Sequence, residues 1–264
     1  ELSSYSYSSI PRCYTYMDTG ALSTSGVTRL HNHPYLKLQG KGTLVAVIDS
    51  GIDYLHPAFH NGVQSKIFSI WDQTLEGGAD GRIPFGREFG RQQIEQALAS
   101  ENPWEIVPSS DTNGHGTRSA ATAAGYRIEK DNFCGAAPEA EIVIVKLKQA
   151  KNYLRDFYLL PRDIDIFQED DIMLAISYVL FIAQEQQMPL SICIGLGTSM
   201  GAHQGEGPLR IYDRILGGLS RFLLYDDSVT DRGKTVSQHS FKEQNAGTVF
   251  CICRNKSTGE LCAN

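Results

Sequence analysis

The sequence predicts an α/β protein built on a doubly wound parallel sheet. Three short runs, at residues 43–48, 141–146 and 190–196, are rich in β-branched residues and almost continuously apolar. Such continuity is typical of strands buried on both faces of a parallel sheet. Between the last two runs, residues 170–187 carry apolar residues at helical spacing, with acidic residues at the start, where the helix dipole favours them. Strands that alternate with helices indicate crossover connections and a doubly wound sheet.

Composition narrows the class of protein further. At a typical size of roughly 150 residues per domain, the 264 residues allow one large α/β domain or two small ones. Hydrophobic residues make up 41%, charged residues 20%, and the net charge is −6. These values exclude a disordered chain and argue against a nucleic-acid partner, which would favour a basic face. No apolar run approaches the roughly 18 residues of a membrane span, and six cysteines are too few for a disulfide scaffold.

Two stretches have the composition of insertions between these elements. Residues 74–108 are rich in glycine and charge, and a short helix is expected near residues 91–99. Residues 149–169 separate the second predicted strand from the long helix. Ligands of doubly wound sheets bind at the carboxyl ends of the strands, so we expect the functional residues there.

The first predicted strand ends in a carboxylate. The run Val-Ala-Val-Ile-Asp-Ser-Gly-Ile-Asp places Asp49 at its carboxyl end. A carboxylate in that position is poorly solvated and must be hydrogen-bonded or paired. Both a capping role in the following turn and a functional role are open on this evidence alone.

A histidine in a glycine-rich setting is the natural partner of this carboxylate. His115 lies between two glycines in Asp-Thr-Asn-Gly-His-Gly-Thr, directly before a run of small residues with helical potential. The glycines leave room for the imidazole and for a neighbouring strand. An aspartate that orients a histidine, with the histidine as general base, makes up two thirds of a serine-hydrolase triad.

Both motifs, in this order, resemble those of the subtilisin-type serine peptidases (subtilases, peptidase family S8). Further segments, such as IWDQT, GAAPEA and KLKQAKNYLRDFY, resemble the clostridial subtilases that include spore-germination proteases. The resemblance covers residues 10–218 and implies a subtilisin-like fold and serine-type endopeptidase activity. It also implies that Asp49 and His115 are the catalytic acid and base. The implied partners are peptide or protein substrates, with no cofactor. The sequence shows no signal peptide or transmembrane segment, and the expected location is the bacterial cytoplasm or the spore.

The third predicted strand leads into Gly195-Leu196-Gly197, which resembles the family's edge segment for an extended peptide substrate. Glycine lets a substrate backbone come close, and backbone hydrogen bonds bind a peptide largely independently of its side chains. Ser199 follows in Gly-Thr-Ser-Met, which resembles the sequence around the nucleophilic serine of subtilases. We expect that Ser199 is not the nucleophile, because it follows directly on a buried strand and because GAHQGEGP after it starts no helix.

The resemblance ends near residue 219, which suggests a division of the chain. Residues 1–12 are expected to be the remnant of a propeptide or linker, residues 13–218 the N-terminal two thirds of a peptidase domain, and residues 219–264 a divergent tail. In this tail only residues 248–253 are strand-like. The fold is therefore expected to be truncated at its C-terminal third. The chain would be an incomplete endopeptidase without its nucleophile, or alternatively a non-catalytic pseudoprotease that binds peptides or a partner protease.

Metal chemistry has little support from the sequence. The cysteines of the tail have the spacing C-x-C-x8-C, which matches no well-defined zinc pattern. His31 and His33 stand in His-Asn-His-Pro, most simply a solvated turn. We therefore expect no metal site.

Overall fold

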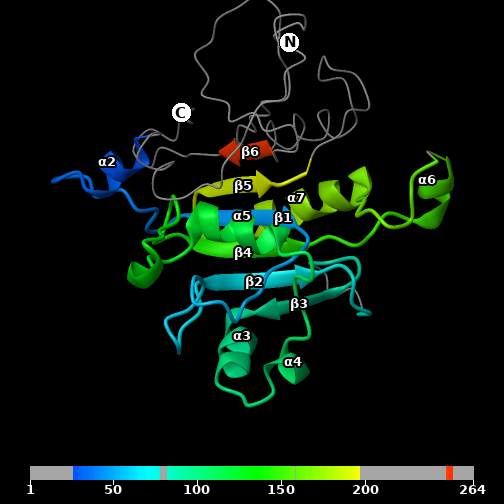
Figure 1. The fold of residues 1–264 in the computed structure, drawn as a ribbon, viewed down its shortest axis with the longest axis horizontal. Helices are drawn as coiled ribbons and strands as arrows, with labels where there is room; N and C mark the ends of the chain where they lie inside the picture. The colour runs from blue at the N-terminus through cyan, green and yellow to red at the C-terminus, as the bar shows by residue number, and fades with distance from the viewer. Residues whose placement is uncertain (1–25, 78–81, 158, 197–247, 252–264) are drawn as a thin grey trace, which may run out of the picture.

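The computed structural model describes residues 26–77, 82–157, 159–196 and 248–251. Helices and strands follow one another in the order shown in Figure 1. They are α2 (Val27–His31), β1 (Leu44–Asp49), β2 (Ile67–Asp72), β3 (Arg87–Gly90), α3 (Arg91–Leu98), α4 (Pro103–Ile106), α5 (His115–Ala124), the 3₁₀ turn η3 (Glu129–Asp131), β4 (Glu141–Lys146), α6 (Asn152–Phe157), α7 (Glu169–Gln186), β5 (Leu190–Ile194) and β6 (Thr248–Cys251).

The strands form one sheet in the order β3-β2-β4-β1-β5-β6. The neighbours β2 and β4, β4 and β1, and β1 and β5 run parallel, whereas β3 and β6 pair antiparallel at the two edges. The predicted α/β class is thus confirmed, and the three predicted strands are present. β4 has the predicted bounds, whereas β1 is shifted by one residue and β5 ends two residues early. All six residues of β1 are buried, as its continuous apolar run predicts. In β5, however, buried and half-buried residues alternate, because Ser191 and Cys193 are only half-buried.

Two strands went unpredicted because their sequences depart from the apolar pattern. β2 contains Ser69, which is buried because its hydroxyl is hydrogen-bonded to the Tyr178 hydroxyl of α7 at 2.8 Å. β3 is a short edge strand that begins with Arg87 and Glu88, in the stretch expected to be an insertion. Charge is typical of edge strands, where it discourages pairing with other chains. The short helix expected near residues 91–99 is present as α3.

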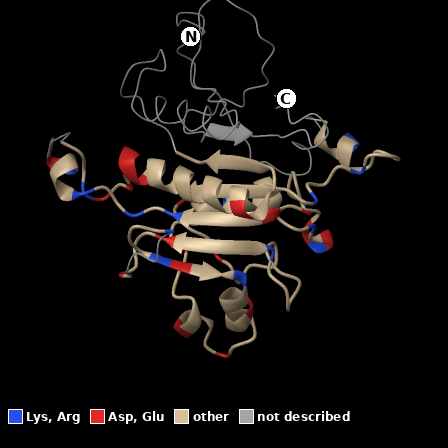
Figure 2. Cartoon of the chain, turned by 180° about the vertical axis from the view of Figure 1, so that it is seen from behind, with Lys and Arg blue, Asp and Glu red and all other residues tan. Residues whose placement is uncertain are grey.

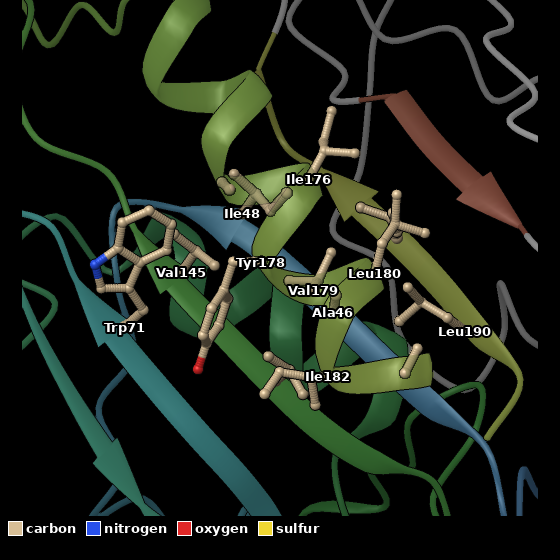
Figure 3. Packing of buried hydrophobic residues seen from close by; sticks show 14 of the residues in the cluster. Ala46, Ile48, Trp71, Val145, Ile176, Tyr178, Val179, Leu180, Ile182 and Leu190 are labelled. Atoms are coloured by element: carbon tan, nitrogen blue, oxygen red, sulfur yellow. The ribbon is translucent and has the colours of Figure 1, made fainter. Parts of the chain in front are cut away.

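Helices cover both faces of the sheet, α5 on one and α7 on the other (Figures 1 and 2). The long helix predicted at residues 170–187 is α7, displaced by one residue. Its buried side packs on side chains of β1, β2, β4 and β5, with Tyr178 against Trp71 at a ring-centroid distance of 5.1 Å (Figure 3). The opposite face packs against α5 and α3. In Figure 2, charged residues gather in helices, loops and strand ends and leave most of the sheet uncoloured. None of the helices in the described ranges is long and apolar enough to span a membrane.

Candidate active site

The site lies at the carboxyl end of β1, the strand between β4 and β5. Asp49 is the last residue of this strand, and its side chain is 2% exposed. The Ser50 backbone N–H donates to Asp49 Oδ1 at 2.7 Å, and the Ser119 hydroxyl donates to Oδ2 at 3.4 Å. This buried carboxylate is therefore hydrogen-bonded, as its position requires.

His115 begins α5 and turns its ring toward Asp49. Its Nδ1 lies 2.8 Å from Asp49 Oδ1 and 2.9 Å from Oδ2. The His115 side chain is 40% exposed, so one side of the ring faces solvent while the other is held by the carboxylate. The structure thus brings together the two residues that the sequence singled out, although they stand 66 positions apart.

The glycines on either side of His115 meet two different requirements. Gly114 has φ +78°, a left-handed conformation that allows the chain to turn into α5. Gly116 allows close packing, because a Cβ atom there would lie 2.2 Å from the Gly51 carbonyl oxygen and 3.1 Å from Asp49 Cβ. Small residues further along, Ala120 and Ala124, continue this contact into the core beneath α5. The short side chains therefore bring α5, and His115 with it, against the end of β1.

Asp111 connects the loop after β1 to the start of α5 through hydrogen bonds. It was assigned no role from the sequence. Its Oδ1 accepts hydrogen bonds from the Ser50 hydroxyl at 2.8 Å and the Gly114 N–H at 2.9 Å. Its Oδ2 accepts from the Thr117 N–H at 2.8 Å and the Thr117 hydroxyl at 2.7 Å. Burial alone would raise the pKa of Asp111, but these hydrogen bonds outweigh burial and lower it. An acidic residue shortly before a helix start was the available signal.

The predicted substrate segment begins beside the Asp–His pair. A Cβ atom at Gly195 would lie 2.1 Å from Asp49 Oδ2 and 2.7 Å from His115 Cε1. Only glycine fits there without displacing the pair. Gly195 and Leu196 are half-buried, just past the end of β5. Gly197 and Ser199 lie outside the described residues.

The far end of α5 is held by a buried lysine. Lys66 donates to the carbonyl oxygens of Ala124 and Pro138, the latter at 2.8 Å, and its Nζ lies 4.2 Å from the ring centroid of Tyr126. Burial lowers the pKa of Lys66 to about 8, although Cys134 and Glu139 oppose this shift. A cation at this end suits the helix dipole, so Lys66 helps to fix the helix that carries His115.

Lys66 should give the protein a stability that rises with pH. Its folded pKa of about 8 lies below the ordinary value of 10.5, so the unfolded chain binds more protons between these values. Stability should therefore rise across this window by up to about 3 kcal/mol, relative to Lys66→Met. Urea unfolding of both proteins from pH 7.5 to 10.5 measures this. Lys66→Arg, charged throughout, is the matched control, and a constant difference between wild type and Lys66→Met would contradict the assignment.

The segment after β4 is tied to the loop that precedes His115. It includes α6, which lies beyond the carboxyl ends of the parallel strands (Figure 1). Asp165 accepts from Asn113 Nδ2 at 2.8 Å and from Gln149 Nε2 at 2.6 Å. Arg155, 6% exposed, donates to Gln149 Oε1 at 2.6 Å and to the Ile164 carbonyl at 2.9 Å. The described residues of this segment, 149–157 and 159–168, therefore lie next to the site and are hydrogen-bonded to it.

Asp165→Ala should loosen this segment without unfolding the protein. Both hydrogen bonds are exposed, so we expect a loss of less than about 1 kcal/mol in global stability. Amide hydrogen exchange in residues 149–168 should accelerate several-fold, while exchange in the sheet stays unchanged. Asp163→Ala, at an exposed position two residues away, is the control. Equal exchange in the two variants would show that Asp165 does not hold the segment.

The two histidines near the start of the described chain are engaged elsewhere. His31 Nε2 is hydrogen-bonded to the Ala136 carbonyl at 2.8 Å. His33 Nδ1 accepts from the backbone N–H groups of Tyr35 and Leu36 at 3.3 and 3.2 Å, as in a turn. Within the described ranges, no three His, Cys, Asp or Glu side chains are grouped so that they could hold a metal ion.

A buried aspartate lies at the end of a parallel strand and is paired with a half-exposed histidine at a helix start. This is the Asp–His arrangement of the charge-relay triads of serine hydrolases. Residues 40–158 match the model of the subtilase family, peptidase family S8. The resemblance to the subtilases that the motifs predicted is thus confirmed over these residues.

Individual relatives support this assignment. Subtilisin-like protease SBT1.9 of Arabidopsis thaliana is 28% identical over 142 residues, covering 48% of this chain and 18% of the relative. Subtilisin-like protease SBT1.4 of the same plant is 30% identical over 125 residues, 41% and 16% of the two chains. The solved CspB protease of Clostridium perfringens has 28% identity and a TM-score of 0.62, covering 75% of this chain and 38% of that protein. The chain thus spans well under half of each of these relatives.

Proposed function

We propose that this chain carries the Asp–His part of a subtilisin-like serine endopeptidase, with Asp49 as the orienting acid and His115 as the general base. The observation that carries the proposal is the contact of His115 Nδ1 with both Asp49 oxygens at 2.8 and 2.9 Å. The match to the subtilase family over residues 40–158 supports the reaction class, acyl transfer by a serine. Peptides or proteins are the substrates that this class implies.

The geometry suits each step assigned to the pair. With its proton on Nδ1, the His115 ring donates to Asp49, and the lone pair on Nε2 can take the proton of a serine hydroxyl. The same nitrogen then returns the proton to the leaving amine. Asp49 holds the ring in this tautomer and stabilises the imidazolium. Its own place is fixed by Ser50 and, through Ser50, by Asp111.

Gly195 to Gly197 would hold the substrate. Gly195 lies against Asp49 and His115, so a peptide paired with the backbone that follows would pass beside the imidazole. Backbone pairing of this kind binds an extended chain largely independently of its sequence.

We further propose that Ser199 is not the nucleophile and that this chain alone does not cleave peptides. A fluorophosphonate probe, read by peptide mass mapping, tests this. No adduct is expected on Ser199. An adduct that forms on Ser199 in the wild-type chain and is lost in His115→Ala would overturn the assignment.

The proposed endopeptidase activity is tested by sequencing the gene and then assaying the protein that it encodes. All three frames are read beyond codon 219 in independent clones. If another frame encodes Ala-Gly-Asn and a later Gly-Thr-Ser loop, the protein made from it should cleave peptides, and His115→Ala should lower kcat at least about 10⁴-fold. If the present frame is confirmed and the chain binds peptides without cleaving them, the non-catalytic alternative replaces the endopeptidase.

A further inference from the structure

A row of alternating charges crosses the sheet at the level of Asp49. In the parallel register, Asp49 of β1 stands opposite Lys146 of β4, and Lys146 stands opposite Asp72 of β2. Residues opposite each other in parallel strands point to the same face, and neighbouring strands lie roughly 4.8 Å apart. The Lys146 ammonium thus has a carboxylate on either side, only one of which belongs to the Asp–His pair.

Lys146 is paired with Asp72 rather than with Asp49. Its Nζ lies 3.5 Å from Asp72 Oδ2. Asp72 is fully buried and accepts from the Ser109 hydroxyl at 2.6 Å and from the Thr74 hydroxyl and N–H at 2.5 and 2.8 Å. A buried carboxylate with this many donors is fixed in place, which makes it a strong anchor for an ammonium group.

The stem of Lys146 also runs under the loop that carries the site. A Cβ atom at Gly51 would lie 3.0 Å from Lys146 Cδ and 3.0 Å from the Ser110 carbonyl oxygen. Ser110 joins Ser109, which binds Asp72, to Asp111, which binds Ser50 and Gly114. Asp72 is therefore linked to the site both through the ammonium and through a continuous loop.

We propose that Asp72 is a positioning residue that keeps the Lys146 ammonium away from Asp49, so that Asp49 is left to His115. The inference rests on the proposed function of the Asp–His pair. Without the Asp72 charge, Asp49 is the carboxylate that stands opposite Lys146 on the neighbouring strand β1. An ammonium bound there would compete with His115 Nδ1 for the same two oxygens. Because Lys146 is paired with Asp72, Asp49 binds the imidazole of His115 and not the ammonium group of Lys146.

The hydrogen-bonded Nδ1 proton of His115 gives a direct measurement. We would follow its downfield proton resonance in the ¹⁵N-histidine-labelled full chain and assign it by its loss in Asp49→Asn. Asp72→Asn should weaken this hydrogen bond and speed exchange of the proton with water by about tenfold, while Asp72→Asn/Lys146→Met should restore the wild-type rate. Wild-type exchange in Asp72→Asn, or failure of the double variant to restore it, would overturn the proposal.

A purely structural role is separated by the double variant. If Asp72 only supported the fold, removal of Lys146 as well would add damage instead of reversing it. Thermal unfolding confirms that each variant is folded at the temperature used. The exchange rate of the His115 Nδ1 proton can be measured without a nucleophile. This test of Asp72 is therefore independent of the fluorophosphonate result on Ser199.

Discussion

Gly116→Ala is expected to lower the free energy of unfolding by about 3 kcal/mol, although alanine is the better helix former by about 1 kcal/mol. The new Cβ atom would lie 2.2 Å from the Gly51 carbonyl oxygen and 3.0 Å from the Gly51 nitrogen. Both are backbone atoms of the loop after β1 and cannot rotate away. Helix α5 must therefore move away from the loop, which also lengthens the contact between His115 and Asp49.

Urea unfolding measures this loss, and Gly90→Ala is the matched control. Gly90 precedes α3 at φ −79° and has nothing within 4 Å of a Cβ atom, so its substitution should change stability by less than about 1 kcal/mol. If the two variants were equally stable, the close packing of α5 on the end of β1 would be wrong.

A strand or helix could be predicted from the sequence where a single residue pattern identifies it. The Asp49–His115 pair could be predicted because each residue stands in a motif of its own. Strands β1 and β4 are buried on both faces and carry continuous apolar runs, and α7 carries a long helical repeat. Strand β2 was missed because Ser69 interrupts its apolar run, and its hydrogen-bond partner, Tyr178, is 109 positions away.

The supporting residues of the site were harder to predict because they depend on register. Asp49 and His115 stand in recognisable motifs, whereas the opposition of Lys146 to both Asp49 and Asp72 exists only once β4 lies between β1 and β2. Similarly, Asp111 resembles an ordinary loop aspartate until the fold brings the Ser50 hydroxyl to it.

Asp111→Ala should cost about 3 kcal/mol of stability at neutral pH. The substitution leaves four donors from Ser50, Gly114 and Thr117 without their acceptor, and each partly buried donor left unsatisfied costs about 1 kcal/mol or more. Ser50 lies in the loop after β1 and Thr117 in the first turn of α5, and Asp111 connects the two. Its removal should therefore loosen the position of His115 as well.

The loss should also depend on pH, with a sign set by the lowered pKa of Asp111. Because the folded pKa lies below that of the unfolded chain, near 3.9, the unfolded state binds more protons between the two values. The stabilisation by Asp111 is thus fully present above about pH 5 and is lost as the pH falls through the folded pKa. Unfolding of wild type and Asp111→Ala between pH 2 and 7 should show their difference shrinking toward low pH, whereas the exposed Asp163→Ala should track wild type throughout. A difference that stayed constant down to pH 2 would mean that the charge of Asp111 does not hold the site together, and that the packing of α5 on the β1 loop positions His115 without it.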